Sequence, residues 1–128
     1  MAETATGPGI RSTGVQEAHL DPWPIPDDQI KNGRPDAAGC LLWQSEDKRF
    51  GNGVWICATG SFDWEYTWDE TIYFLQGEIT ITDHTVGKVN TYRTGDMIFV
   101  PTGTRSTWEI TKPVRKVFHF HSATPVQL

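Results

Sequence analysis

The chain has 128 residues and a formal net charge of −5, and its 11 lysines and arginines are scattered along the sequence. This length suits one domain with a single core that buries about two thirds of the surface of the unfolded chain. Without a basic cluster, nucleic acids and anionic membranes are not expected as partners.

Residues 1–20 are polar and rich in Gly, Thr and Ala, a composition typical of a disordered or loosely attached arm. The first residues lack the charged and apolar regions of a signal peptide. No apolar run approaches the ~20 residues that span a bilayer. We therefore expect a flexible N-terminal arm on a cytoplasmic protein.

Residues 21–39 contain closely spaced prolines, followed by the turn sequence Asn32-Gly33-Arg34-Pro35. Because proline lacks a backbone N–H group, this segment cannot form a central strand of a sheet. We expect an extended, Pro-rich segment that wraps around the domain that follows it.

From residue 40 onward, short runs rich in Val, Ile, Thr and aromatic residues alternate with turn signals, at Gly51-Asn52-Gly53, Asp83-His84, Gly95-Asp96 and Lys112-Pro113. This pattern is typical of an all-β sandwich or barrel, and no segment has the period of a helix. Residues 40–128 are predicted to form one β-barrel. The two cysteines in it, Cys40 and Cys57, are too few for a disulfide framework and are expected to be small core residues.

The strand around Glu70 has a readable register. Strict alternation places Ile72 and Phe74 on the same face as Glu70. The opposite face carries Thr71, Tyr73 and Leu75. Since neither face is polar, this strand is predicted to be buried.

Two segments resemble the two motifs of the cupin family, with matching spacings. In Gly60–Gly77 a glutamate, Glu70, stands seven residues before a turn glycine, and Gly95-Asp-Met-Ile-Phe-Val-Pro-Thr-Gly103 supplies the second motif. With the blocks 55–64, 106–109 and 112–116, roughly residues 30–121 are similar to small single-domain cupins of largely unassigned function. These are similar to the barrels of ureidoglycine aminohydrolases and of the ethanolamine-utilisation protein Q. The resemblance implies an RmlC-like, double-stranded β-helix (jelly-roll) barrel with a pocket between two sheets, often in a homodimer.

The resemblance also bears on metal binding. In metal-binding cupins, two histidines and a glutamate of the first motif and a histidine of the second point into the pocket. Here these positions hold Trp64, Tyr66, Glu70 and Ser106. A carboxylate with a phenol and a hydroxyl is a poor donor set for a transition metal, so no metal or other cofactor is expected. The manganese of ureidoglycine aminohydrolase keeps a metal-dependent enzyme as an alternative.

His119 and His121 alternate with Phe118 and Phe120, so both imidazoles share one face of a strand. Either the phenylalanines fill the core and the histidines lie at the surface or a subunit contact, or the histidines turn inward. In the second case they would line the pocket beside Glu70, as a two-histidine, one-carboxylate set for metal binding or proton transfer. Arg115 and Lys116 are expected on a solvated face.

Glu70 and Tyr66 are the candidate catalytic residues. Glu70 could simply accept structural hydrogen bonds, or desolvation by aromatic rings could make it a general acid or base near neutral pH, with Tyr66 as a hydrogen-bond donor. Rings at the ligand positions of the motifs would favour a flat, cationic or sugar-like ligand. The predicted pocket lining comprises Trp64, Trp68, Ser106, Trp108, His119 and His121.

The function that these observations favour is a metal-independent enzyme that acts on a small polar metabolite by acid/base chemistry, as a lyase, isomerase or hydrolase. The alternatives are a non-catalytic metabolite-binding or sensing barrel and a metal-dependent cupin enzyme. A homodimer is expected, because the Pro-rich segment and outward apolar residues such as Tyr73 and Leu75 need a covering surface.

Overall fold

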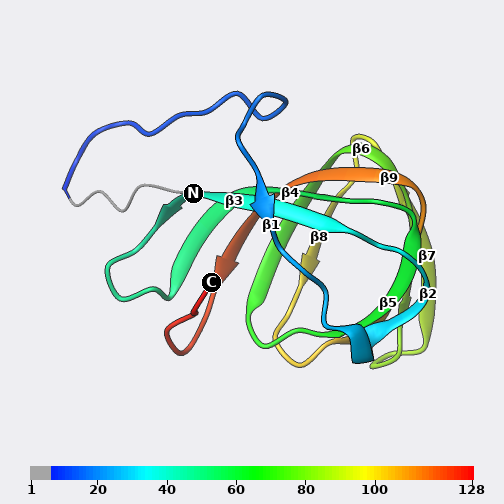
Figure 1. Cartoon of the computed structure of the whole chain (residues 1–128). Coiled ribbons are helices and arrows are strands. Elements are labelled where there is room, and N and C mark those ends of the chain that lie inside the picture. The colour runs from blue at the N-terminus through cyan, green and yellow to red at the C-terminus, as the bar shows by residue number, and fades with distance from the viewer. Residues whose placement is uncertain (1–6) are drawn as a thin grey trace.

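A computed structural model describes residues 7–128 as an all-β fold, which confirms the predicted class (Figure 1). The strands are β1 (Asp21–Pro22), β2 (Ile30–Gly33), β3 (Ala37–Gln44), β4 (Phe50–Cys57), β5 (Gly60–Glu65), β6 (Asp69–Asp83), β7 (Lys88–Arg93), β8 (Met97–Val100) and β9 (Arg105–His121). A short 3-10 turn, η1 (Asp27–Gln29), precedes β2. Within residues 7–128, no helix has the length and apolar character that crossing a membrane would require.

The strands form one antiparallel sheet that curls into a barrel (Figure 1). Along the main path the order is β1-β3-β4-β9-β5-β2, and β6 pairs with β7, β8 and β9. The long strands β6 and β9 run beside each other over most of their length. Residues on their inward faces therefore meet in the interior although they are far apart in the sequence.

Strand β9 changes partners near its middle. Its first part pairs with β5 as far as Ile110, and its second part pairs with β4 from Val114 onward. Pro113, which the sequence predicted to lie in a turn, lies inside β9 at this change of partner. Neither β4 nor β5 pairs with Pro113, so its missing N–H group breaks no hydrogen bond with those strands.

The core lies inside the barrel and is built from buried residues of β4, β5, β6, β8 and β9. Ile72 and Phe74 are fully buried on the same face as Glu70, which confirms the predicted register. The strand is buried on that face alone, however, because Tyr73 on the opposite face is 41% exposed. That face points outside the barrel, where a strand can present aromatic side chains to solvent. Cys57 is buried as predicted, and Cys40 is half-buried.

Residues 21–39 supply short strands to the two ends of the strand order. Among residues 7–128, β1 pairs with β3 alone and β2 with β5 alone, so the proline-rich segment stays out of the centre of the sheet, as its composition requires. Residues 7–20 form no strand, yet Arg115 donates a hydrogen bond to the carbonyl oxygen of Val15 over 2.8 Å. Of the arm predicted for residues 1–20, residues 1–6 lie outside the described part of the chain.

Candidate functional site

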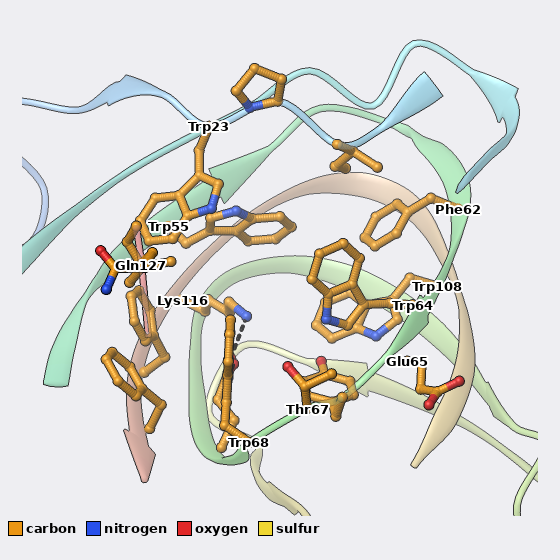
Figure 2. A pocket seen from close by; sticks show the side chains of 17 residues that line it. Trp23, Trp55, Phe62, Trp64, Glu65, Thr67, Trp68, Trp108, Lys116 and Gln127 are labelled. Atoms are coloured by element: carbon orange, nitrogen blue, oxygen red, sulfur yellow. Dashed lines mark hydrogen bonds and ion pairs between the residues drawn. The ribbon is translucent and has the colours of Figure 1, made fainter. Parts of the chain in front are cut away.

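The barrel contains a cavity of about 420 Å³ with predominantly aromatic walls (Figure 2). Its rings come from the segment after β1, from β4 and β5, from the connection between β5 and β6, and from β9: Trp23, Trp55, Phe62, Trp64, Tyr66, Trp68, Trp108, Phe118 and Phe120. Glu70 and Lys116 are the charged groups buried in the lining, whereas Glu65 is exposed. The site thus combines a ring-lined space with one buried charge of each sign.

Strand alternation explains why β9 contributes so much of this wall. Trp108, Lys116, Phe118 and Phe120 all occupy even positions, and all four are buried while Glu109 and His119 between them are exposed. The same alternation along β6 turns Glu70 inward beside Ile72. The pleat of two neighbouring strands therefore places Lys116 and Glu70 in the same interior.

Glu70 is held from two sides. Its Oε2 atom accepts a hydrogen bond from Lys116 Nζ over 2.8 Å, and its Oε1 atom accepts one from the indole Nε1 of Trp68, also over 2.8 Å. The side chains of Lys116 and Glu70 are only 9% and 7% exposed. An ammonium and an indole N–H group are both hydrogen-bond donors that suit a carboxylate oxygen. Figure 2 shows Lys116 and Trp68 on the same side of the cavity, with the ion pair drawn as a dashed line.

Lys116 also lies against aromatic rings. Its Nζ atom is 4.6 Å from the ring centroid of Trp55, 5.2 Å from that of Trp108 and 5.6 Å from that of Phe118. These cation-π contacts and the ion pair offset the cost of burying an ammonium. The expectation that Lys116 lies on a solvated face is wrong. The signal that could have located it was present, because Lys116 alternates in step with Phe118 and Phe120, two candidates for the core.

Tyr66 lies in the connection between β5 and β6, and it is 3% exposed. Burial raises the pKa of its phenol well above the ordinary value, and the negative charge of Glu70 raises it further, while a hydrogen bond with the Trp108 side chain acts in the opposite direction. Its backbone exchanges hydrogen bonds with the loop at residues 103–104, because Gly103 N–H donates to Tyr66 O and Tyr66 N–H donates to Thr104 O. Tyr66 is thus a fixed, neutral phenol in the cavity wall.

The other predicted site residues divide into two groups. Trp64, Trp68 and Trp108 line the cavity with Glu70 and Tyr66. Ser106 is buried but does not line it, because its hydroxyl donates to the backbone oxygen of Trp64 over 2.8 Å. Trp23 and Trp55, which the sequence did not single out for the pocket, also belong to the wall.

The placement of His119 and His121 in the pocket is wrong. Both histidines are exposed, and Phe118 and Phe120 take the inward positions, as the other interpretation of this strand predicted. The ring of His121 stacks on Phe50 outside the cavity, with centroids 4.6 Å apart and an angle of 4° between the planes. The larger apolar side chains occupy the interior, and the imidazoles face outward.

Comparison with known proteins agrees with this architecture. The family model for the EutQ-like cupin domain matches residues 44–118. The chain belongs to this family of cupins. No curated protein matches the chain.

Solved structures with the same fold show how far the likeness extends. This cupin is 23% identical to the EutQ protein of Clostridium difficile, with a TM-score of 0.61 over 75% of this chain and 77% of that one. A protein of unknown function from Pseudomonas syringae pv. tomato is 23% identical, with a TM-score of 0.74 over 82% of this chain and 45% of that one. The polyketide cyclase RemF from Streptomyces resistomycificus is 17% identical, with a TM-score of 0.57 over 81% of this chain and 82% of that one. At these identities the likeness establishes the fold alone.

The residues of this EutQ-like cupin do not fit a transition metal. Both oxygens of Glu70 are engaged, the phenol of Tyr66 is held neutral by burial, and the hydroxyl of Ser106 donates to backbone. Across residues 7–128, no group of three or more His, Cys, Asp and Glu side chains converges as metal ligands would. The positive charge next to the carboxylate is supplied by the protein itself, through Lys116.

Proposed function

We propose that this EutQ-like cupin binds a small molecule in its aromatic cavity and acts on it by metal-independent acid/base chemistry. The observation that carries the proposal is the buried ion pair between Glu70 and Lys116 in the cavity wall. A volume of about 420 Å³ is within the range of small-molecule sites. A buried charged pair that only held strands together would not need to line such a space.

The two charges suit opposite halves of a proton transfer. A carboxylate such as Glu70 can take a proton from a carbon or a hydroxyl group of the ligand. The negative charge that develops on a ligand oxygen would be stabilised by the ammonium of Lys116, which needs no reorganisation because the rings and Glu70 already hold it in place. Tyr66 would remain a neutral hydrogen-bonding group throughout. Such a step occurs in lyase, isomerase and hydrolase reactions that use acid/base catalysis.

Substitution of Glu70 tests the catalytic part of this proposal. A thermal-shift screen of small acids, amines, ketones, nucleosides and sugars identifies compounds that stabilise the protein, and each is then followed by NMR for turnover. Glu70→Gln should abolish turnover because an amide cannot accept the proton. The matched control is Glu65→Gln, which changes an exposed carboxylate at the same cavity. Full turnover by Glu70→Gln would contradict the assigned role.

A non-catalytic binding barrel is the second candidate function. It is favoured by the hydrogen bonds that each oxygen of Glu70 already accepts, since a carboxylate held in this way can serve to position Lys116 toward a ligand. In that case a stabilising compound would be recovered unchanged, and Glu70→Gln would alter its affinity alone. Product formation by the unmodified protein would exclude this candidate.

A further inference from the structure

We propose that the ligand is a flat aromatic molecule that carries carbonyl or carboxylate oxygens. This inference rests on the proposed function and replaces the small polar metabolite expected from the sequence with a more apolar class. Three features of the cavity lead to it: the ring surfaces that remain uncovered, the position of the buried ammonium, and the balance of free hydrogen-bond donors and acceptors.

The ring surfaces favour a flat molecule. Trp23, Trp55, Trp64 and Trp68 all line the cavity and are only partly buried, so each retains surface that a ligand can cover. In Figure 2, Trp23 and Trp55 lie on one side of the cavity and Trp64 on another. Aromatic ligands gain from stacked and edge-on contacts with such rings beyond the burial of area.

The rings are also held in fixed orientations by one another. Trp108 stacks on Phe62 with centroids 5.9 Å apart, and it meets Trp55 edge-on at 6.0 Å. Because these contacts fix the walls before a ligand enters, little side-chain entropy is lost on binding. This part of the cavity wall is therefore formed before a ligand enters and presents ring surfaces to it.

The position of Lys116 disfavours a cationic ligand. An aromatic cage attracts a cation through its ring faces, but here the ammonium of Lys116 already lies over Trp55, Trp108 and Phe118. The carboxylate of Glu70, which could have attracted a second cation, is paired with Lys116. A ligand cation would thus meet the repulsion of an ammonium without a free buried counter-charge.

The polar groups of the wall are mainly donors. Within residues 7–128 the indole N–H groups of Trp23, Trp55 and Trp64 have no hydrogen-bond partner, and Glu70 is the one hydrogen-bond partner of the Lys116 ammonium, which has three N–H groups. Each oxygen of Glu70, the carboxylate buried in the wall, already accepts one hydrogen bond. Carbonyl and carboxylate oxygens match the free donors, whereas the many hydroxyl donors of a sugar would find few free acceptors among the described residues of the wall.

A matched set of naphthalene derivatives tests this ligand class by isothermal titration calorimetry. The probes are 2-acetonaphthone, 2-naphthoate and 2-naphthylmethylammonium, with cyclohexyl methyl ketone as a non-planar ketone and glucose as a sugar. We expect 2-acetonaphthone and 2-naphthoate to bind at least about tenfold more tightly than the ammonium, the non-planar ketone and glucose. Equal or tighter binding of the ammonium or of glucose would overturn the inference, and so would the absence of binding by both oxygen-bearing naphthalenes.

Variants connect the preference to the cavity. Trp64→Leu should weaken binding of 2-acetonaphthone, whereas Trp43→Leu, a tryptophan outside the cavity wall, should leave it unchanged. Lys116→Met should remove the preference for the ketone over the ammonium. Because that variant leaves the Glu70 charge unpaired, the neutral double variant Lys116→Met/Glu70→Gln is measured beside it and should lose the same preference. A preference that survives in the folded double variant would contradict the role given to the ammonium.

The proposed ligand class and the proposed catalytic role of Glu70 can be refuted independently of each other. If other compounds of the thermal-shift screen bind and react with dependence on Glu70 but the naphthalene ketone and carboxylate do not bind, the ligand class is overturned and the proposed function stands. If the naphthalene ketone and carboxylate bind with the expected preference and nothing is turned over, the ligand class is supported and the catalytic role of Glu70 fails.

Discussion

The ammonium of Lys116 lies 2.8 Å from the carboxylate of Glu70, although the two residues are 46 positions apart. They meet because β6 and β9 are neighbours in the sheet and both side chains point into the barrel. In the register of these strands Lys116 is opposite Phe74, and Glu70 is opposite Phe120. The ion pair therefore spans the strand pair diagonally, within a layer of aromatic rings.

Removal of Lys116 alone should destabilise the protein. Lys116→Met leaves a buried carboxylate with the indole of Trp68 as its remaining donor, and breaking a buried pair in this way costs about 3 to 5 kcal/mol. The double variant Lys116→Met/Glu70→Gln carries no unpaired charge and should recover most of this loss. Urea denaturation monitored by circular dichroism gives the free energies of unfolding. A single variant as stable as the parent would show that the pair contributes no stability.

Stability should fall at alkaline pH. Burial raises the pKa of the Cys57 thiol to about 12 from an ordinary value of 9.0, and the pKa of the Tyr66 phenol is also raised. Both groups keep their protons to higher pH in the folded state than in the unfolded state. Their contribution is therefore complete below about pH 9 and is lost progressively as pH rises toward about 12.

Urea denaturation at pH 7, 9 and 10.5 shows which groups cause the loss of stability at alkaline pH. Tyr66→Phe and Cys57→Ala each remove one titrating group, so the free energy of unfolding of each variant should decline less steeply with pH than that of the parent. The absolute stability of Cys57→Ala is expected to be lower at every pH, because the smaller side chain leaves a cavity. If the free energy of unfolding declined equally steeply with pH in the parent and in both variants, groups other than Tyr66 and Cys57 would be responsible for the loss of stability.

Removal of divalent metals should leave ligand binding unchanged. The donor set around Glu70 does not fit a metal, so protein dialysed against EDTA is expected to bind its ligand with the affinity of untreated protein. His119→Ala and His121→Ala should also leave the affinity unchanged, because both imidazoles lie outside the cavity. Stoichiometric metal in protein purified without a tag or chelator, measured by mass spectrometry, would contradict this expectation.

A homodimer remains a prediction, and the structure indicates where to test it. On the outer face of β6 and β8, Tyr73 is 41%, Met97 71% and Phe99 61% exposed, and Tyr73 is paired with Met97 across the strands. An exposed apolar patch of this kind favours association with a second copy. Light scattering should give the mass of a dimer for the parent and of a monomer for Phe99→Arg. A monomeric parent at micromolar concentration would refute the prediction.

Much of the fold could be predicted from local patterns. Turn spacing and β-branched runs indicated an all-β barrel, and the cupin motifs indicated where Glu70 would lie. The prediction from sequence failed where the local residue composition favoured a turn and the pairing of strands in the sheet imposed a continuous strand. Lys112-Pro113 has the composition of a turn, but β9 continues through it because the strand changes partners there.

In the candidate site, too, local patterns predicted one part of the arrangement and missed another. Alternation along β9 already grouped Lys116 with Phe118 and Phe120, and a charged side chain is nevertheless expected at the surface because burial is costly without a partner. That partner is Glu70, on another strand. The pattern within β9 contains no information about the charge that faces it from β6.

The amino-acid sequence by itself determined the all-β class, the cupin motifs and which residues share a face of each strand, because these depend on backbone chemistry and on the two-residue period of a pleated strand. The tertiary structure alone decided that the face of Phe118 points inward, that Lys116 and Glu70 form one buried pair, and that Trp23 and Trp55 complete the wall. These features depend on which strands become neighbours when the sheet closes, and that is settled by packing of the whole interior.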